Sequence, residues 1–251
     1  MLDIPAYDLY QMLSQAMLFA ERDPGLPAIH AVVLEFDGTN LIAAATDRFK
    51  LIAIRYRIET PDTGQEVVPF KMTLPIPQVK LLLTHLKTPP AWRFTRHVTV
   101  DIGGSNALDV QDVLAPNIFN ITNADAKVSV VVEPVASRLA QFPDWKPLFA
   151  EPEPGLNIPA IEGVHAIALA AHNMETFFKL AKLRTDNRFH GTLRFRFSDS
   201  VHKVVVNVDD DCAGIVMPVR MDDPPSNPQW LTRTDSGTSV SRTGAKGKKS
   251  K

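Results

Sequence analysis

Apolar and polar positions follow two periods along the chain, one typical of helices and one typical of strands. Apolar residues recur every three or four positions at 5–22, 77–87 and 173–184, so each segment predicts an amphipathic helix with one buried face. Shorter apolar runs, bounded by turn residues, predict strands. We expect strands at 29–36, 41–45, 51–56, 67–74, 92–95, 98–102, 107–110, 128–133, 166–170, 191–198, 203–208 and 213–219.

The ends of the predicted helices carry recognisable signals. Pro5 suits the first turn of the first helix, and Pro89-Pro90 stops the second. Asn173 can cap the third helix by accepting a bond from a backbone N–H group. The predicted inner face of this third helix consists of Met174, Phe177, Phe178 and Ala181.

The second and third predicted helices follow a strand, and each of the three precedes several strands, which indicates about three copies of one strand–helix–strands unit. This order predicts an α+β fold. We place a first domain with two units at 1–127 and a second, smaller lobe at 128–223. Residues 224–251 are rich in Ser, Thr, Gly and Lys, a composition that predicts a disordered basic tail.

Composition narrows the class of protein. The 251 residues are 45% hydrophobic, enough for a sizeable core, and the single cysteine, Cys212, rules out a disulfide framework and favours a reducing cytoplasm. The N-terminus has no signal-peptide pattern, and no apolar run is long enough for a membrane span. The net charge of −1 combines a basic tail with an acidic body, unlike a conventional DNA-binding domain, which is basic overall.

Motifs for catalysis are missing from the sequence. It contains no Gly-rich phosphate loop, no C-x-x-C, no H-E-x-x-H and no G-x-S-x-G pattern. His165 and His172 flank one predicted strand, and 209–211 is a run of three aspartates, but such residues are more often ordinary surface histidines and a solvated turn. We therefore expect a non-catalytic protein with no metal and no cofactor.

Three stretches far apart in the sequence point to one family. Residues 45–52, 142–145 and 217–221 resemble, in this order, the A-T-D-G-H-R-L-A, F-P-D-Y and M-P-M-R-L stretches of the bacterial DNA polymerase III beta sliding clamp, the ring that tethers DNA polymerase to its template. The resemblance covers 29–221. The chain departs from the family in its length, in its tail and at Arg48, where the family has Gly. It therefore resembles a shortened, phage- or plasmid-like version.

The resemblance implies a sliding-clamp fold of strand–helix–strand repeats, with antiparallel sheets outside and helices inside. It implies a DNA polymerase processivity factor that encircles duplex DNA, without reading its sequence, and binds a replicative DNA polymerase and a clamp loader. The ring is expected to be a cytoplasmic homo-oligomer of three copies or, with three half-units per chain, of four. The alternative is a clamp-derived interaction module that binds or blocks a polymerase or clamp loader without encircling DNA.

The resemblance also implies two sets of site residues. The first lines a hydrophobic pocket for peptides of the polymerase and the loader: Thr46, Arg48, Phe49, Lys50, Leu51, Pro143, Leu148, Val216, Met217, Pro218, Val219, Arg220 and Met221. The second lines the hole, where a sliding ring needs cations that face phosphates and no base readout. These DNA-lining residues are Lys80, Lys87, Lys179, Lys182 and Arg184.

Overall fold

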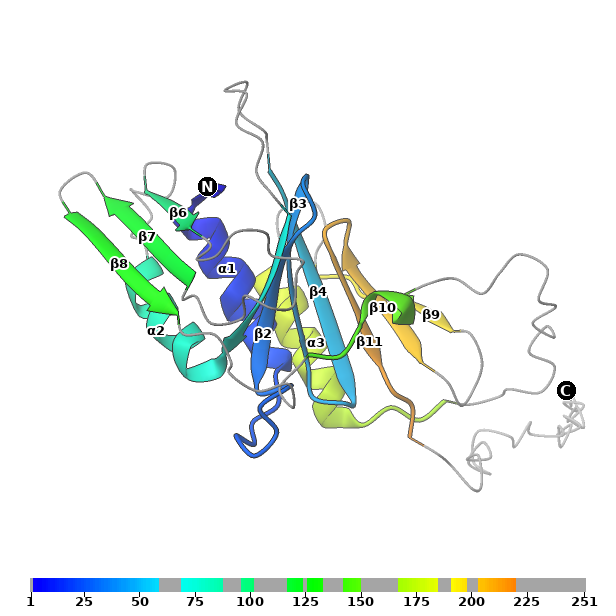
Figure 1. Ribbon diagram of the computed structural model, residues 1–251. Helices are drawn as coiled ribbons and strands as arrows, with labels where there is room; N and C mark the ends of the chain where they lie inside the picture. Colours follow the sequence, from blue (N-terminus) through cyan, green and yellow to red (C-terminus); the bar gives the residue numbers. More distant parts are fainter. Residues whose placement is uncertain are drawn as a thin grey trace, which may run out of the picture. The chain divides into compact units, whose positions relative to one another are not determined.

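The structure, a computed structural model (Figure 1), describes residues 2–58, 69–87, 96–101, 117–123, 126–132, 142–149, 167–184, 191–197 and 203–219. The chain divides into Met1–Arg220 and Met221–Lys251, and every described residue belongs to the first part. The fold of this part is α+β, with antiparallel sheets and few helices, as the sequence predicts. In these ranges, no helix has the length and apolar character needed to cross a membrane.

Three similar units, here named repeats 1, 2 and 3, follow one another. Repeat 1 contains β1 (Leu2–Pro5), α1 (Ala6–Ala16), the 3-10 turn η1 (Met17–Phe19), β2 (Ala31–Phe36), β3 (Asn40–Thr46) and β4 (Lys50–Arg57). Repeat 2 contains β5 (Phe70–Pro75), α2 (Ile76–Leu86), β6 (His97–Asp101), β7 (Asn117–Asn123) and β8 (Ala126–Val132). After the 3-10 turn η4 (Lys146–Phe149), repeat 3 contains α3 (Ala171–Leu183), β9 (Arg194–Phe197), β10 (Val204–Asp209) and β11 (Cys212–Val216).

Repeats 1 and 2 exchange their first strands. β1 pairs with β6 in a sheet of order β1-β6-β7-β8, and β5 pairs with β2 of repeat 1. The exchange is reciprocal, because the first N–H of each helix bonds to the carbonyl just before the first strand that follows the other repeat's helix, β6 or β2. These bonds join Ala6 to Arg96 at 2.8 Å and Ile76 to His30 at 3.1 Å. Since α1 also packs against α2, the two repeats share one core.

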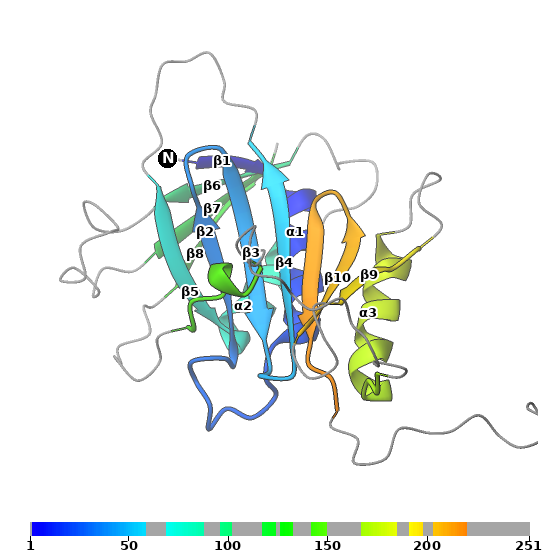
Figure 2. The same cartoon turned by 90° about the vertical axis from the view of Figure 1, so that its right-hand side faces the viewer.

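Repeat 3 attaches to the edge of repeat 1. β11 pairs antiparallel with β4, which extends the larger sheet to seven strands in the order β5-β2-β3-β4-β11-β10-β9 (Figure 2). Phe177 of α3 meets Phe19 of η1 edge to face, with ring centroids 4.9 Å apart. Both aromatic rings are fully buried in the core that α1 and α2 also cover. The helices of all three repeats therefore lie on the same, inner face of the seven-stranded sheet.

Gly214 on β11 sets how closely α3 approaches this sheet. A Cβ atom here would lie 2.5 Å from Cε1 of Phe177 and 2.6 Å from the carbonyl oxygen of Leu51. We expect Gly214→Ala to lower the free energy of unfolding by about 1–3 kcal/mol, the usual cost of overpacking a core. Gly25→Ala is the control, because a Cβ atom there meets only the side chain of exposed Asp23. Urea unfolding measures both variants, and equal midpoints would contradict the close packing.

The three predicted helices are confirmed, but details of α3 differ. Its N-cap is Ala170 and no side chain caps it, so the prediction that Asn173 caps the helix is wrong. Asn173 is instead buried in the first turn. Phe178, predicted to face inward, is 59% exposed. Strand β1 was not predicted, because four residues ahead of a helical pattern show too little alternation to stand out.

Other expectations concern strands and domain limits. The expected strand at 166–170 is reduced to a single bridge between Ala168 and Val219. The expected strands at 92–95 and 107–110, and the tail at 224–251, lie outside the described residues. The division into 1–127 and 128–223 stays a prediction, although β8 runs across the first limit.

Candidate partner-binding surface

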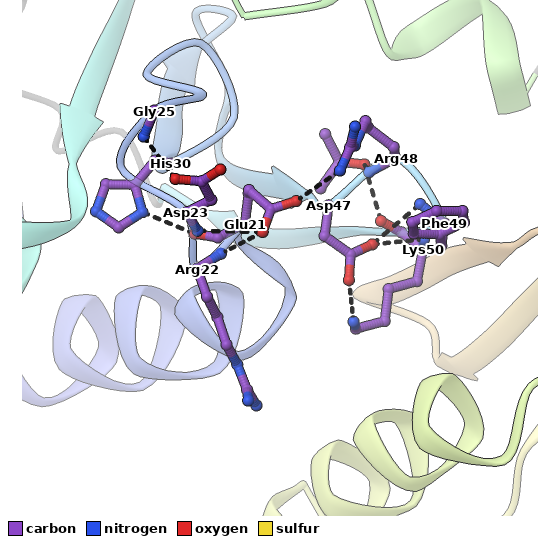
Figure 3. A network of polar contacts seen from close by, with 10 residues as sticks. Glu21, Arg22, Asp23, Gly25, His30, Asp47, Arg48, Phe49 and Lys50 are labelled. Atoms are coloured by element: carbon purple, nitrogen blue, oxygen red, sulfur yellow. Dashed lines mark hydrogen bonds and ion pairs between the residues drawn. The ribbon is translucent and has the colours of Figure 1, made fainter.

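The turn between β3 and β4 is held by the carboxylate of Asp47. Its Oδ1 accepts hydrogen bonds from the N–H groups of Phe49 at 3.0 Å and Lys50 at 2.9 Å (Figure 3). The hydroxyl of Thr46 donates to the carbonyl of Lys50 at 2.8 Å. These bonds hold the turn at 47–49, which leaves the side chains of Arg48 and Phe49 exposed.

Arg48 adopts a backbone conformation that favours glycine. Its φ is 79°, and it is the one non-Gly residue with a positive φ among those the structure describes. The turn between β2 and β3 has the same design: Asp37 binds the N–H groups of Thr39 and Asn40, and its second residue is Gly38, with φ 102°. A left-handed conformation costs a non-Gly residue about 1–2 kcal/mol. Strain of this kind is typical of functional positions.

The side chains of Arg48 and Phe49 form an exposed pair. The guanidinium carbon lies 5.7 Å from the centroid of the Phe49 ring, within the range of a cation–π contact. Arg48 also meets the carboxylate of Glu21 at 3.4 Å (Figure 3). Phe49 is 53% exposed, so packing in the hydrophobic core does not account for a large aromatic residue at this turn. The pair is therefore available to a partner.

The stretch after β11 runs beside this turn. The N–H of Met217 donates to the carbonyl of Phe49 at 2.8 Å, and the N–H of Val219 donates to the carbonyl of Ala168 at 2.8 Å. Met217 is 41% exposed, and Val219 is exposed as well. We call Arg48, Phe49, Met217 and Val219 the turn surface. It joins two of the three stretches on which the family resemblance rests.

The third stretch covers the outer face of the seven-stranded sheet. Phe142 and Trp145 are buried there against Leu51 and Ile215, and η4 follows directly (Figure 2). Ion pairing of Lys146 with Glu35 and a hydrogen bond from Lys203 to the carbonyl of Leu148 fix this segment. Pro143 and Leu148 remain exposed beside the buried aromatic residues.

Several residues of the predicted pocket are used inside the fold. Alternate residues of a strand point to opposite faces. Leu51 is therefore buried in the outer cluster, whereas Lys50 points to the helix side, where its ammonium group pairs with Asp47. Val216 is buried in the main core, and Thr46 is buried with its hydroxyl bonded in the turn.

The other predicted pocket residues divide into two groups. Arg220 and Met221 lie outside the described residues. Those with side chains that are not buried are Arg48, Phe49, Pro143, Leu148, Met217, Pro218 and Val219. The structure brings Phe49 and Met217 together through a backbone bond. That the exposed residues bind a peptide stays a prediction.

A cavity of about 380 Å³ opens beside β4 and β11, at the end of these strands that lies away from the turn surface. Ala53 and Ala213 lie in its floor, and these small side chains leave a hollow beside the ring of Trp145. Arg55 lines it too and pairs with Asp211 at 2.7 Å. None of the predicted pocket residues lines this cavity. The sequence gives little sign of it, because two alanines in separate strands show no pattern until the strands pair.

The predicted DNA-lining residues also divide into two groups. Lys80 and Lys87 at α2, and Lys179 and Lys182 on α3, are exposed. Arg184 is not free, since Nε and Nη2 of its guanidinium bind both carboxylate oxygens of Asp209, at 2.6 and 3.1 Å. Its Nη1 donates to Oε1 of Gln15 on α1 at 2.8 Å. This arginine therefore connects repeats 1 and 3, a role that helical periodicity could not reveal.

Comparisons with known proteins place this geometry in a known fold. No protein-family model and no curated protein sequence matches the chain. The DNA polymerase III beta subunit of Thermotoga maritima is 15% identical with a TM-score of 0.59, over 88% of this chain and 65% of that chain. The DNA polymerase III subunit beta of Pseudomonas aeruginosa is 13% identical with a TM-score of 0.55, over 87% of this chain and 66% of that one.

A third solved structure agrees with these two. The DNA polymerase sliding clamp of Bacillus subtilis is 13% identical with a TM-score of 0.59, over 87% of this chain and 64% of that chain. The present chain thus spans slightly less than two thirds of the length of each of these neighbours. A likeness at such low identity concerns the fold alone. The described part of the chain has a sliding-clamp fold.

Proposed function

We propose that this chain is a DNA sliding clamp, a non-catalytic processivity factor. It encircles duplex DNA as a homo-oligomeric ring and tethers the replicative DNA polymerase, after a clamp loader has placed it on DNA in the cytoplasm. One observation carries the proposal: the bond between Met217 and Phe49 joins two distant stretches on the surface of a sliding-clamp fold.

The turn surface supports the tethering part of the proposal. Phe49 and Met217 expose large apolar side chains next to each other, and their backbones are fixed by hydrogen bonds within the fold. A preorganised apolar pair loses little entropy when a partner binds, so most of its burial energy contributes to affinity. A flexible methionine also adapts to partners with different side chains. Both properties suit a protein that serves a polymerase and a loader in turn.

The exposed lysines support the DNA part. We expect combined replacement of Lys80, Lys179 and Lys182 by Ala to weaken duplex binding equally for all DNA sequences. The plot of log affinity against log salt should become shallower by about 0.9 for each phosphate that the variant no longer neutralises. Fluorescence anisotropy over a salt series measures this slope.

The matched control for this experiment is Lys71→Ala. Lys71 is an exposed lysine on β5, where its neighbours Phe70 and Met72 face the helices, so it lies on the outer face of the sheet. Its removal should leave the salt slope unchanged. The experiment uses the chain cut after Asp223 alongside the full chain, because the lysines of the tail bind DNA unspecifically. Equal slopes for the lysine variant and the Lys71 control would count against DNA contact by the helices.

The alternative function is a clamp-derived interaction module that binds or blocks a polymerase or loader without encircling DNA. One observation favours it, namely that Arg184, one of the five predicted DNA-lining residues, is bonded to Asp209 and Gln15 instead of being free to face a phosphate. Light scattering separates the two functions, because a tether must form a closed ring. A chain that binds polymerase while remaining monomeric at micromolar concentration would support the interaction module.

A further inference from the structure

The three helices carry the same apolar stripe. Counted from the first helical residue, the fourth, seventh, eighth and eleventh positions are apolar in each helix. These residues are Leu9, Met12, Leu13 and Ala16 in α1, Val79, Leu82, Leu83 and Leu86 in α2, and Met174, Phe177, Phe178 and Ala181 in α3. The seventh and eleventh residues are buried in all three helices, so the stripes are equivalent in space as well as in sequence.

The eighth position differs between the repeats. Leu13 of α1 is fully buried, and Leu83 of α2 packs against the core, whereas Phe178 of α3 is 59% exposed. Met174, one turn before Phe178, is half-buried, although its counterparts Leu9 and Val79 are fully buried. The cause is the set of neighbours that each helix has. α1 and α2 pack against each other, whereas the main packing of α3 among the described elements is onto β10.

Repeats 1 and 2 show what a complete lobe requires. Each repeat gives its first strand to the other and covers the other's helix. From its helix onward, repeat 3 has the same order of elements, a helix followed by three strands, but the described residues hold no fourth repeat. Among the described residues, repeat 3 therefore lacks the companion that repeats 1 and 2 give each other.

We propose that this companion is repeat 3 of a second copy, so that two copies associate through their α3 helices as an antiparallel two-fold pair. In this arrangement, opposite charges of the two copies lie next to each other around Phe178. Glu175 lies three residues before Phe178 and Lys182 four residues after it, on the same exposed side of the helix. In an antiparallel pair centred on Phe178, Glu175 of each copy, which pairs with Lys179 on its own helix at 2.7 Å, also faces Lys182 of the partner subunit. A two-fold contact needs such a self-complementary patch.

Lys182 belongs both to this interface and to the proposed DNA-lining residues, so the two roles need separate measurements. The test therefore uses the full chain without DNA, and its failure leaves the DNA experiments untouched. Sedimentation velocity over a concentration series should show a multimer of the parent chain that dissociates on dilution. Phe178→Glu should weaken the association at least about tenfold, because it places two like charges in an apolar contact. Since Phe178 is exposed, the far-UV spectrum and melting temperature of the variant should stay close to those of the parent.

Leu81→Glu is the matched control. Leu81 is an exposed leucine on α2, and its position in the helix lies outside the shared stripe. This change should leave the association unaltered. A parent chain that is monomeric at every concentration, or a Phe178→Glu variant that associates as tightly as the parent, would overturn the proposal.

A charge exchange tests the antiparallel arrangement itself. Glu175→Lys and Lys182→Glu should each weaken the association, because each variant places like charges opposite one another. The variant with both changes should recover most of the parent affinity, since the pair is restored in the reverse sense. Recovery supports the two-fold α3 contact, and a double variant as weak as the single ones would overturn it.

Discussion

Arg184→Ala is expected to lower the free energy of unfolding by about 3 kcal/mol, because it removes one partner of a partly buried ion pair and its hydrogen bonds. The Arg184 side chain is only 18% exposed, and it binds both oxygens of Asp209 at the end of β10. It also donates to Gln15, which is buried on α1. The substitution would leave the partly buried Asp209 carboxylate without its cation.

The Arg184 guanidinium stays protonated and charged over the ordinary pH range. Burial, the largest single influence, would lower the pKa of the guanidinium, but the hydrogen bond to Asp209 and the negative charges of Cys212, Asp209 and Asp211 together raise the pKa above its ordinary value. Because the pKa is raised, the charged Arg184 contributes fully to the free energy of unfolding below the unfolded-state pKa. This contribution is lost only as pH rises through the folded-state pKa. Both values lie in strong alkali, so the arginine side of the pair should add no pH dependence near neutrality.

Arg194→Ala provides the control for this prediction. Arg194 is in the same sheet, but its side chain is 60% exposed and its contact with Asp210 is long, at 3.7 Å. Exposed pairs contribute about 0–1 kcal/mol, so this variant should unfold close to the parent. Guanidinium chloride unfolding compares the two. Equal losses would mean that the bond network of Arg184 does not hold repeat 3 to repeat 1.

Replacing Phe49 and Met217 together by Ala is expected to weaken polymerase binding by about 3–5 kcal/mol, which corresponds to more than a hundredfold in affinity. The two side chains are the large apolar members of the turn surface, and paired aromatic and flexible anchors of this size act as hot spots. Because both are substantially exposed in the free chain, their truncation opens no cavity in the core. The melting temperature should therefore change little.

Isothermal titration calorimetry with the cognate polymerase subunit measures this effect. Val131→Ala is the matched control, since Val131 is an exposed apolar residue on β8, in the other sheet. It should bind like the parent. If the double variant binds polymerase as the parent does, or if it melts far lower while its folded fraction binds normally, the turn surface is not the docking site.

The sequence predicted the repeating architecture well, because its signals are local. The stripe around Val79 and Leu82 fixes a helix at α2, and Pro77 agrees with a start at Ile76. The motif at 45–52 correctly placed a turn between two paired strands. Alternation along β4 could not tell which face Lys50 takes, because a cation is expected outside and its partner Asp47 becomes visible only in the folded turn.

The failures concern contacts between segments that are distant in sequence. Phe178 fits the helical stripe, and only the packing of the other helices shows that its face lacks a cover among the described elements. Arg184 looks like a solvent-facing cation until β10 brings Asp209 to it. The cavity beside Trp145 depends on alanines from two strands that meet in one sheet. None of these relations follows from local periodicity.

Retention on circular DNA tests the central claim most directly. The full chain and the chain cut after Asp223 are loaded by a clamp loader onto closed circular duplex DNA and washed in high salt, which removes contacts made only to phosphates. A ring that encircles DNA should remain on the circle and leave as soon as the circle is cut. Release from closed and cut DNA at the same rate would contradict a sliding clamp.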